Sequence, residues 1–248
     1  MASTQMNTET ERVRYSCPSV SPNDVAHFSW EHPVPKNKFW SDLPYTLARN
    51  FLQACNADDL AYIRPLAESD SDKPRREKLQ LLDRWVKKKL IQEEASAAPR
   101  SFYDVDYAGW ERLMLASVSI SKELGDSARE EDTLRLLVDR RKDRSNLSHL
   151  HNLAGMLVEK GDYAEAERLE RKVEPWLISK LGRDSPQALG AKRIMILAMW
   201  KQGRSRHADA EKLLRELQSD LSALGDGQYA MYRDEELSAM KELMAQMD

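Results

Sequence analysis

The sequence predicts an all-α protein, a right-handed array of helical hairpins preceded by a diverged helical segment. Three observations predict it. Glycine is sparse, with nine in 248 residues, whereas good helix formers such as Leu, Ala, Glu, Lys and Arg abound. From Tyr107 onward, apolar residues recur at intervals of three and four without the alternation typical of strands. Gly161 and Gly203 lie 42 residues apart, and each follows an expected helix.

Composition limits the class of protein. Hydrophobic residues make up 41% and charged residues 32%, and no apolar run approaches the 18 residues of a membrane span. The N-terminal stretch lacks the apolar core of a secretory signal, and Cys17 and Cys55 are too isolated to indicate a disulfide framework. A net charge of -3 indicates no basic field for nucleic acid. We therefore expect neither a membrane nor a nucleic-acid partner, and a cytoplasmic location with the nucleus as the alternative.

Residues 1–40 are expected to form an extended, partly disordered arm. Proline at 33 and 35 excludes a regular helix there. Four aromatic residues accompany these prolines: Phe28, Trp30, Phe39 and Trp40. The simpler interpretation is that these rings pack onto the body of the protein. The alternative is a partner-binding arm or a lid over a pocket.

Residues 41–100 form the predicted N-terminal helical segment. One helix is expected from Ser41 or Asp42 to about Cys55, and a short one from Asp58 to near Pro65. Asp72 is expected to cap the next helix, and "EASAAPRS" reads as a linker. The apolar stripe of that helix is Leu79, Leu82, Val86 and Leu90. Its three consecutive lysines, Lys87, Lys88 and Lys89, are expected to lie on a solvated face.

Residues 101–248 are expected to hold the repeats and a capping helix. Glycines follow the predicted helices at positions 125, 161, 182, 203 and 225. Ser127 and Glu130 suggest a capping box, and Ser185 followed by Pro186 suggests another helix start. The motif "A-[ED]-A-E-[RK]-L" occurs at 164–169 and at 208–213. Ala154, Ala164 and Ala166 are small enough to let two antiparallel helices approach closely.

The stretch "NLAGMLVEKGDYAEAERLERKVEPWLISKLGRDSP" resembles a tetratricopeptide repeat of the 42-residue kinesin-light-chain type. The resemblance covers about 100 residues and is most specific over this one repeat. Ser185 and Ile194 depart from the family pattern, and Pro175 should kink its helix. The matching positions are Asn152, Leu153, Ala154, Leu157, Gly161, Tyr163, Glu165, Ala166, Glu167, Leu181, Gly182, Asp184 and Pro186.

The resemblance implies a non-catalytic adaptor or scaffold that binds a peptide or protein in a concave groove lined by the first helix of each pair. The implied groove positions are His151, Asn152, Val158 and Glu159, then Arg193, Leu197, Trp200 and Lys201. An asparagine amide there both donates to and accepts from a peptide backbone. The two cations suit an acidic segment or a terminal carboxylate. Alternatively, the N-terminal region or the last helix fills the groove.

Two competing functions stay open. One is a helical enzyme or small-molecule binder whose pocket the aromatic arm closes, although no catalytic or metal-binding motif and no cofactor signature is present in the sequence. His149 and His151 point to different helix faces, and a zinc site from Cys17, His27 and His32 lacks ligands. The other is a homodimeric structural or regulatory subunit. Its interface would be the stripe of the last helix, which otherwise reads as a cap: Leu237, Met240, Met244 and Met247.

Overall fold

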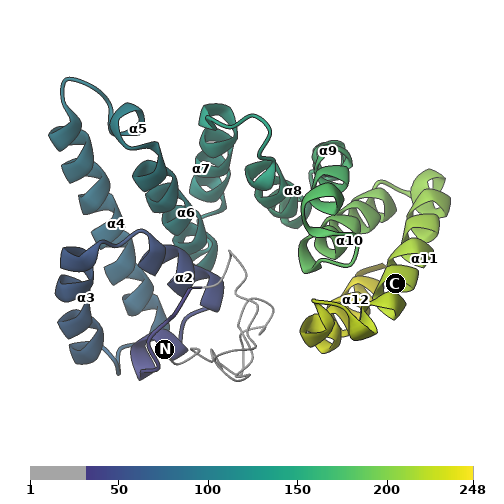
Figure 1. The fold of residues 1–248 in the computed structure, drawn as a ribbon, viewed down its shortest axis with the longest axis horizontal. Coiled ribbons are helices and arrows are strands. Elements are labelled where there is room, and N and C mark those ends of the chain that lie inside the picture. Colours follow the sequence, from purple (N-terminus) through teal and green to yellow (C-terminus); the bar gives the residue numbers. More distant parts are fainter. Residues whose placement is uncertain (1–31, 248) are drawn as a thin grey trace. The chain divides into compact units, whose positions relative to one another are not determined.

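A computed structural model describes residues 32–247, and within them the chain forms helices and turns without a strand, as predicted (Figure 1). The chain divides into two compact units. Unit 1 ends at Leu137 and unit 2 begins at Val138. Most of the expected arm, with Cys17, His27, Phe28 and Trp30, lies outside the described residues.

In unit 1, α6 packs on α2, α4 and α5, and the long helix α4 also packs on α5. The last residues of α7 extend past the end of the unit. The helices are α1 (Lys38–Ser41), α2 (Tyr45–Gln53), α3 (Ala57–Ser69), α4 (Arg75–Ala97), α5 (Phe102–Val105), α6 (Tyr107–Leu124) and α7 (Ser127–Arg140).

A chain of aromatic rings fills the core of unit 1. Phe39 and Trp40 lie with ring centroids 5.1 Å apart, Trp40 and Phe51 at 5.8 Å, and Phe51 and Trp85 at 5.0 Å. The Phe39 side chain is 0% exposed and that of Trp40 is 2% exposed. Phe39 and Trp40 therefore pack in the core of unit 1.

The start of unit 1 differs from the prediction. Residues 38–41 already form α1, because the Asn37 side chain caps it by accepting from the Trp40 N–H at 3.2 Å. Asp72 does not cap α4. Its carboxylate pairs with Lys38 Nζ at 2.6 Å, and Pro74 takes the N-cap position.

Two helices run further than predicted. α3 continues past Pro65 to Ser69, because a capping box of Asn56 and Asp59 holds its start, and Ile63 at its middle and Ala67 in its last turns are buried. α4 includes the first half of the expected linker, since "EEASA" is made of residues that favour or tolerate a helix.

The boundary between the units lies after residue 137 instead of residue 100. Trp110, Leu113 and Ile120 of α6 belong to the same core cluster as Phe51 and Trp85. A cut at residue 100 would divide that core, so α5 and α6 belong with the N-terminal helices. The cap of α7 is also displaced by one residue, because Asp126 accepts from the Arg129 N–H at 3.2 Å.

Unit 2 is an array of helix pairs in which each helix packs on the next. α10 also packs on α8 and on α12, so it has the most neighbours. The elements are α8 (Ser148–Lys160), α9 (Tyr163–Leu181), α10 (Pro186–Lys201), the 3₁₀ turn η2 (Arg204–Arg206), α11 (His207–Ala223), η3 (Leu224–Asp226), η4 (Ala230–Tyr232) and α12 (Arg233–Met247).

Local signals place most helix ends of unit 2 correctly. Gly161 ends α8 at φ 93°, a left-handed conformation that favours glycine. The Ser185 hydroxyl accepts from the Ala188 N–H at 3.2 Å, and Pro186 is the first residue of α10. Pro175 lies inside α9, which is assigned as one helix from Tyr163 to Leu181.

One small-residue assignment is wrong. Ala154 and Ala166 are fully buried, as expected at a close helix contact, but Ala164 is exposed. Residues two apart on a helix are separated by about 200° around its axis, so Ala164 and Ala166 cannot face the same neighbour.

The core of unit 1 should be sensitive at α4. Leu82→Ala is expected to lower the free energy of unfolding of unit 1 by roughly 2–5 kcal/mol, because it leaves a cavity around a side chain that is 0% exposed. Urea unfolding with hydrogen exchange of the α4 amides measures it. The exposed Gln80→Ala is the control; equal effects of both substitutions would contradict the assigned face of α4.

Candidate functional site

Two glycines lie where α8 and α10 face each other, and each leaves room for a methyl group at ordinary contact distance. A methyl group on Gly155 of α8 would lie 3.7 Å from Ile194 Cδ1, and one on Gly190 of α10 would lie 3.9 Å from His151 Nε2. Sequence analysis did not single out these glycines. A glycine inside a helix costs about 1 kcal/mol relative to alanine, and the contact distances here give no steric reason for that cost.

The α8 positions of the expected groove differ in exposure. His151 is partly buried, and its Nδ1 lies 2.6 Å from Oε1 of Glu170 on α9, a carboxylate that is 0% exposed. Asn152 and Glu159 are exposed, and Val158 is half-buried. His151 is thus held against the second helix of its own pair, whereas Asn152 faces solvent.

Arg193, the first α10 position, already has a partner inside the protein. Its guanidinium forms an ion pair with Glu236 of α12, whose side chain is 0% exposed. Glu236 of α12 therefore binds the guanidinium that was expected to bind an acidic ligand. Of the remaining α10 positions, Leu197 and Trp200 are half-buried and Lys201 is exposed.

Trp200 stacks on His207, the first residue of α11. The ring centroids are 3.6 Å apart and the planes differ by 8°. Both side chains are half-buried, so the stacked pair forms part of the surface at the turn from α10 to α11.

Lys192, beside Arg193, makes a second buried ion pair. Its Nζ pairs with Asp220 of α11 and lies 3.9 Å from Glu174 Oε1 of α9, while its side chain is 1% exposed. Burial raises the pKa of Glu174, and the charge of Lys192 offsets part of that rise. Lys192 therefore links α10 to both α9 and α11.

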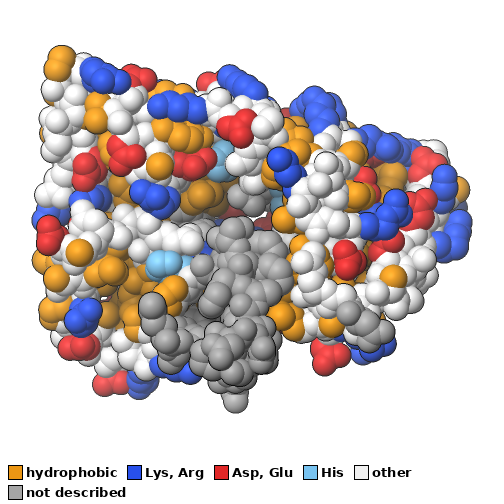
Figure 2. Space-filling view, viewed as in Figure 1, with side chains coloured by type: hydrophobic (Ala, Val, Ile, Leu, Met, Phe, Trp, Pro, Cys, Tyr) orange, Lys and Arg blue, Asp and Glu red, His pale blue; other side chains and the backbone are white. Residues whose placement is uncertain are grey.

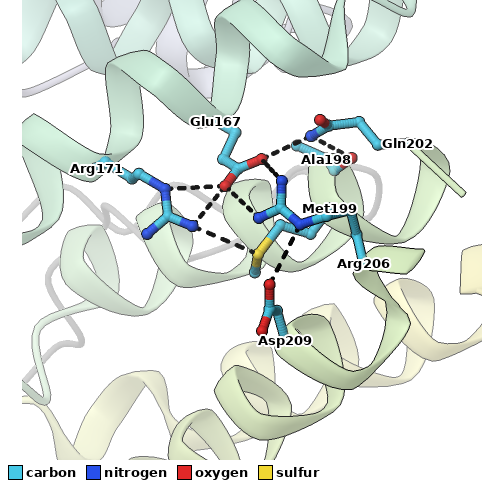
Figure 3. A network of polar contacts seen from close by, with 7 residues as sticks. All are labelled: Glu167, Arg171, Ala198, Met199, Gln202, Arg206 and Asp209. Atoms are coloured by element: carbon cyan, nitrogen blue, oxygen red, sulfur yellow. Dashed lines mark hydrogen bonds and ion pairs between the residues drawn. The ribbon is translucent and has the colours of Figure 1, made fainter. Parts of the chain in front are cut away.

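Glu167 of α9 is the centre of a polar network (Figure 3). Its carboxylate accepts from Arg171 Nη2 at 2.6 Å, Gln202 Nε2 at 2.7 Å and Arg206 Nη2 at 2.8 Å. Arg206 also donates to Asp209 at 3.2 Å. Burial alone would raise the pKa of Glu167, but these donors outweigh it and the pKa is lowered. The network ties α9 to the turn between α10 and α11.

The apolar stripe expected on α12 is divided between two faces. Met240 is buried, with Glu236, Ala239 and Leu243, whereas the Leu237 side chain is 41% exposed and that of Met244 is 47% exposed. The face toward the array is therefore set by residues at three- and four-residue steps from Glu236. Leu237 and Met244 lie on the outward side, and Met247 is half-buried.

Other candidate chemical groups of the described residues have structural roles. The Tyr45 hydroxyl accepts from the His32 backbone N–H at 3.1 Å, and burial lowers the pKa of the His32 imidazole, aided by Arg49. Burial raises the pKa of the Cys55 thiol to about 12, which keeps it protonated. Residues 32–247 hold no cluster of three or more metal-ligating side chains and no helix suited to spanning a membrane.

The comparison with known families agrees with the geometry of α8 and α9. Residues 146–173 match the family model of the tetratricopeptide repeat. The chain contains a tetratricopeptide repeat. Its first helix is α8, and its second helix, α9, buries the small residue Ala166 in its first turn. Searches of curated proteins and of solved structures found no match.

Glu167 should stabilise unit 2 in a pH-dependent way. Its folded-state pKa lies below the ordinary value of 4.5, so its contribution is complete above that value and is lost as the pH falls through the folded-state pKa. At pH 7, Glu167→Gln is expected to lower the free energy of unfolding by roughly 1–3 kcal/mol.

Urea unfolding of Glu167→Gln and wild type at pH 7 and in acid measures this difference, which should shrink in acid. Glu211→Gln, an exposed carboxylate of α11, is the control and should behave as wild type at both values. A difference between wild type and Glu167→Gln that is independent of pH would refute the electrostatic explanation.

The Arg193–Glu236 pair should hold α12 in place. Arg193→Met leaves the Glu236 carboxylate buried without this cation and is expected to cost roughly 3–5 kcal/mol of stability in unit 2. The second substitution Glu236→Leu should recover most of the loss, because no buried charge then remains. Urea unfolding and hydrogen exchange of α12 measure both variants. Wild-type protection of α12 in Arg193→Met alone would show that the pair is dispensable.

Proposed function

We propose that unit 2 is a non-catalytic adaptor or scaffold module that binds an extended segment of a partner protein across α8 and α10. Tetratricopeptide repeats generally mediate protein interactions, and residues 146–173 match one. The first helix of such a repeat is the usual binding helix, and here it is α8. The proposed setting is the cytoplasm.

Asn152 is the observation that carries the proposal. It is exposed on α8, and its amide has no hydrogen-bond partner within residues 32–247. A side-chain amide offers a donor and an acceptor at once, so it can pair with both groups of a peptide unit. This free amide contrasts with His151 beside it, which is held by Glu170.

The side chains along α10 suit an apolar and weakly charged ligand. Leu197 and Trp200 are half-buried and leave part of their apolar surface accessible. Arg193 is neutralised by Glu236. The other predicted cation of α10, Lys201, is exposed and forms no ion pair among the described residues. The proposed ligand is therefore held mainly through its backbone and apolar side chains, with one acidic contact at Lys201.

The spacing of the helix ends supports the longer repeat type within this proposal. Gly161 and Gly203 lie 42 residues apart, and α9 extends for 19 residues. A second helix of this length is consistent with the 42-residue repeats of kinesin light chains, and we propose the same subtype here.

The test is affinity capture from the native host with the whole protein. The groove variant is Asn152→Ala/Lys201→Glu, and its control is Lys172→Glu/Gln218→Ala on the second helices α9 and α11; all four side chains are exposed. Loss of two such contacts should weaken the partner at least about tenfold, a change of about 1.4 kcal/mol.

A captured protein is then divided into overlapping peptides, and binding of each is measured by fluorescence anisotropy. One peptide should bind wild type and the control equally and the groove variant at least about tenfold more weakly. Equal binding to all three proteins would reject the groove. Arg193 is left out of the variant because its loss is expected to disturb α12.

A further inference from the structure

The exposed side of α4 carries three basic side chains that have no acidic partner among residues 32–247. Arg76, Arg84 and Lys88 are exposed, and none forms an ion pair with another residue of the described range. Other cations of this helix are neutralised. Arg75 pairs with Glu123, Lys87 with Asp83, and Lys89 with Asp59 and Glu93.

The three free cations occupy one side of the helix. Successive members are eight and four residues apart, so all three lie within about a third of the helix circumference and span roughly 18 Å along its axis. Gln80, which is exposed and uncharged, lies between Arg76 and Arg84. Arg76, Gln80, Arg84 and Lys88 are called the basic stripe here, and one exposed carboxylate, Glu77, lies in the same arc beside Arg76.

The basic stripe leads into an apolar hollow. Ile91 falls within the same arc of α4, and its side chain is 71% exposed. The hollow has a volume of about 530 Å³ and lies between α4, α5 and α6. Its lining is mainly hydrophobic: Leu90, Ile91, Glu94, Ala95, Phe102 and Trp110.

The one carboxylate in this lining is already engaged, because Glu94 Oε2 accepts from the Phe102 N–H at 3.0 Å. Its lone pairs thus serve to hold the start of α5. Figure 2 shows hydrophobic side chains at the surface in the region of α4, α5 and α6, among basic and acidic ones.

We propose that this surface of unit 1 binds an acidic peptide segment whose single apolar side chain enters the hollow. The free cations complement several Asp or Glu side chains, and the lining complements one aliphatic or aromatic anchor. A nucleic acid matches the charges but offers no aliphatic group for the hollow. A membrane surface requires a broader apolar face than Ile91 of α4 and Val105 of α5, which are 71% and 54% exposed.

This surface is separate from the groove proposed on unit 2, so either proposal can be refuted without affecting the other. Because the cations are exposed, binding should weaken as salt is added. The apolar anchor should supply the part of the affinity that salt does not remove.

The test is a selection of random 12-residue peptides displayed on phage against the whole protein. The enriched peptides should be acidic and share one large apolar residue. They are then synthesised and titrated against Arg76→Glu/Arg84→Glu/Lys88→Glu, against Arg76→Gln/Arg84→Gln/Lys88→Gln, and against Ile91→Asp. Their affinity should fall at least about tenfold in the Glu variant and in Ile91→Asp, and less in the Gln variant.

Two controls assign the effect to the surface. Arg64→Glu/Lys172→Glu/Lys212→Glu makes the same charge change at exposed positions elsewhere and should keep wild-type affinity. The groove variant Asn152→Ala/Lys201→Glu should also keep it. Failure to enrich acidic peptides, or equal loss in the charge control, overturns the proposal.

Two further probes exclude the other classes of partner. A 20-nucleotide single-stranded DNA and vesicles of phosphatidylcholine with phosphatidylserine are titrated against wild type and the Glu variant. If the DNA or the vesicles bind wild type more tightly than the selected peptides do, and this binding is lost in the Glu variant, the peptide assignment is overturned in favour of that partner. Circular dichroism confirms that each variant is folded.

Discussion

The order of unit 2 depends on two buried cations at neighbouring positions of α10. Lys192 and Arg193 are consecutive, so they project about 100° apart around the helix and reach different partners. Lys192 pairs with Asp220 of α11, and Arg193 pairs with Glu236 of α12. A buried charge without its counter-ion is costly, so these pairs specify which helices lie beside α10. The apolar contacts around them then set how closely the helices pack.

The features that sequence predicts well are those decided within one helical turn. Gly161 ends α8 because it adopts the left-handed backbone conformation at the helix end. Ser185 starts α10 because its hydroxyl accepts a hydrogen bond from a free backbone N–H of the first turn. Asp72 shows the limit of such signals. It is a good cap by local rules, yet its carboxylate pairs with Lys38, which lies 34 residues away. Burial of Phe39 and Trp40 depends on the whole core of unit 1, so a proline-rich context alone cannot predict it.

The candidate site was predictable in its position and less so in its chemistry. The repeat motif locates Asn152 and Trp200, because it fixes which turn of which helix each occupies. It does not report what a later helix places against them. Arg193 acquires its partner from α12, 43 residues further along the chain. Glu167 is likewise recognisable in the motif as an expected Glu, but its link to Gln202 and Arg206 needs the fold.

The contact between α12 and α10 sets how this array can be lengthened or recombined. In a simple stack, each helix pair depends only on its immediate neighbours, so units can be inserted or exchanged at any junction. Here α12 is paired with α10 through Glu236 and Arg193, although α11 lies between them in the sequence. A repeat inserted between α11 and α12 would separate Arg193 from Glu236 and leave two unmatched interior charges. Helices α10 to α12 therefore form one indivisible block for repeat engineering, and a repeat can be inserted ahead of this block but not within it.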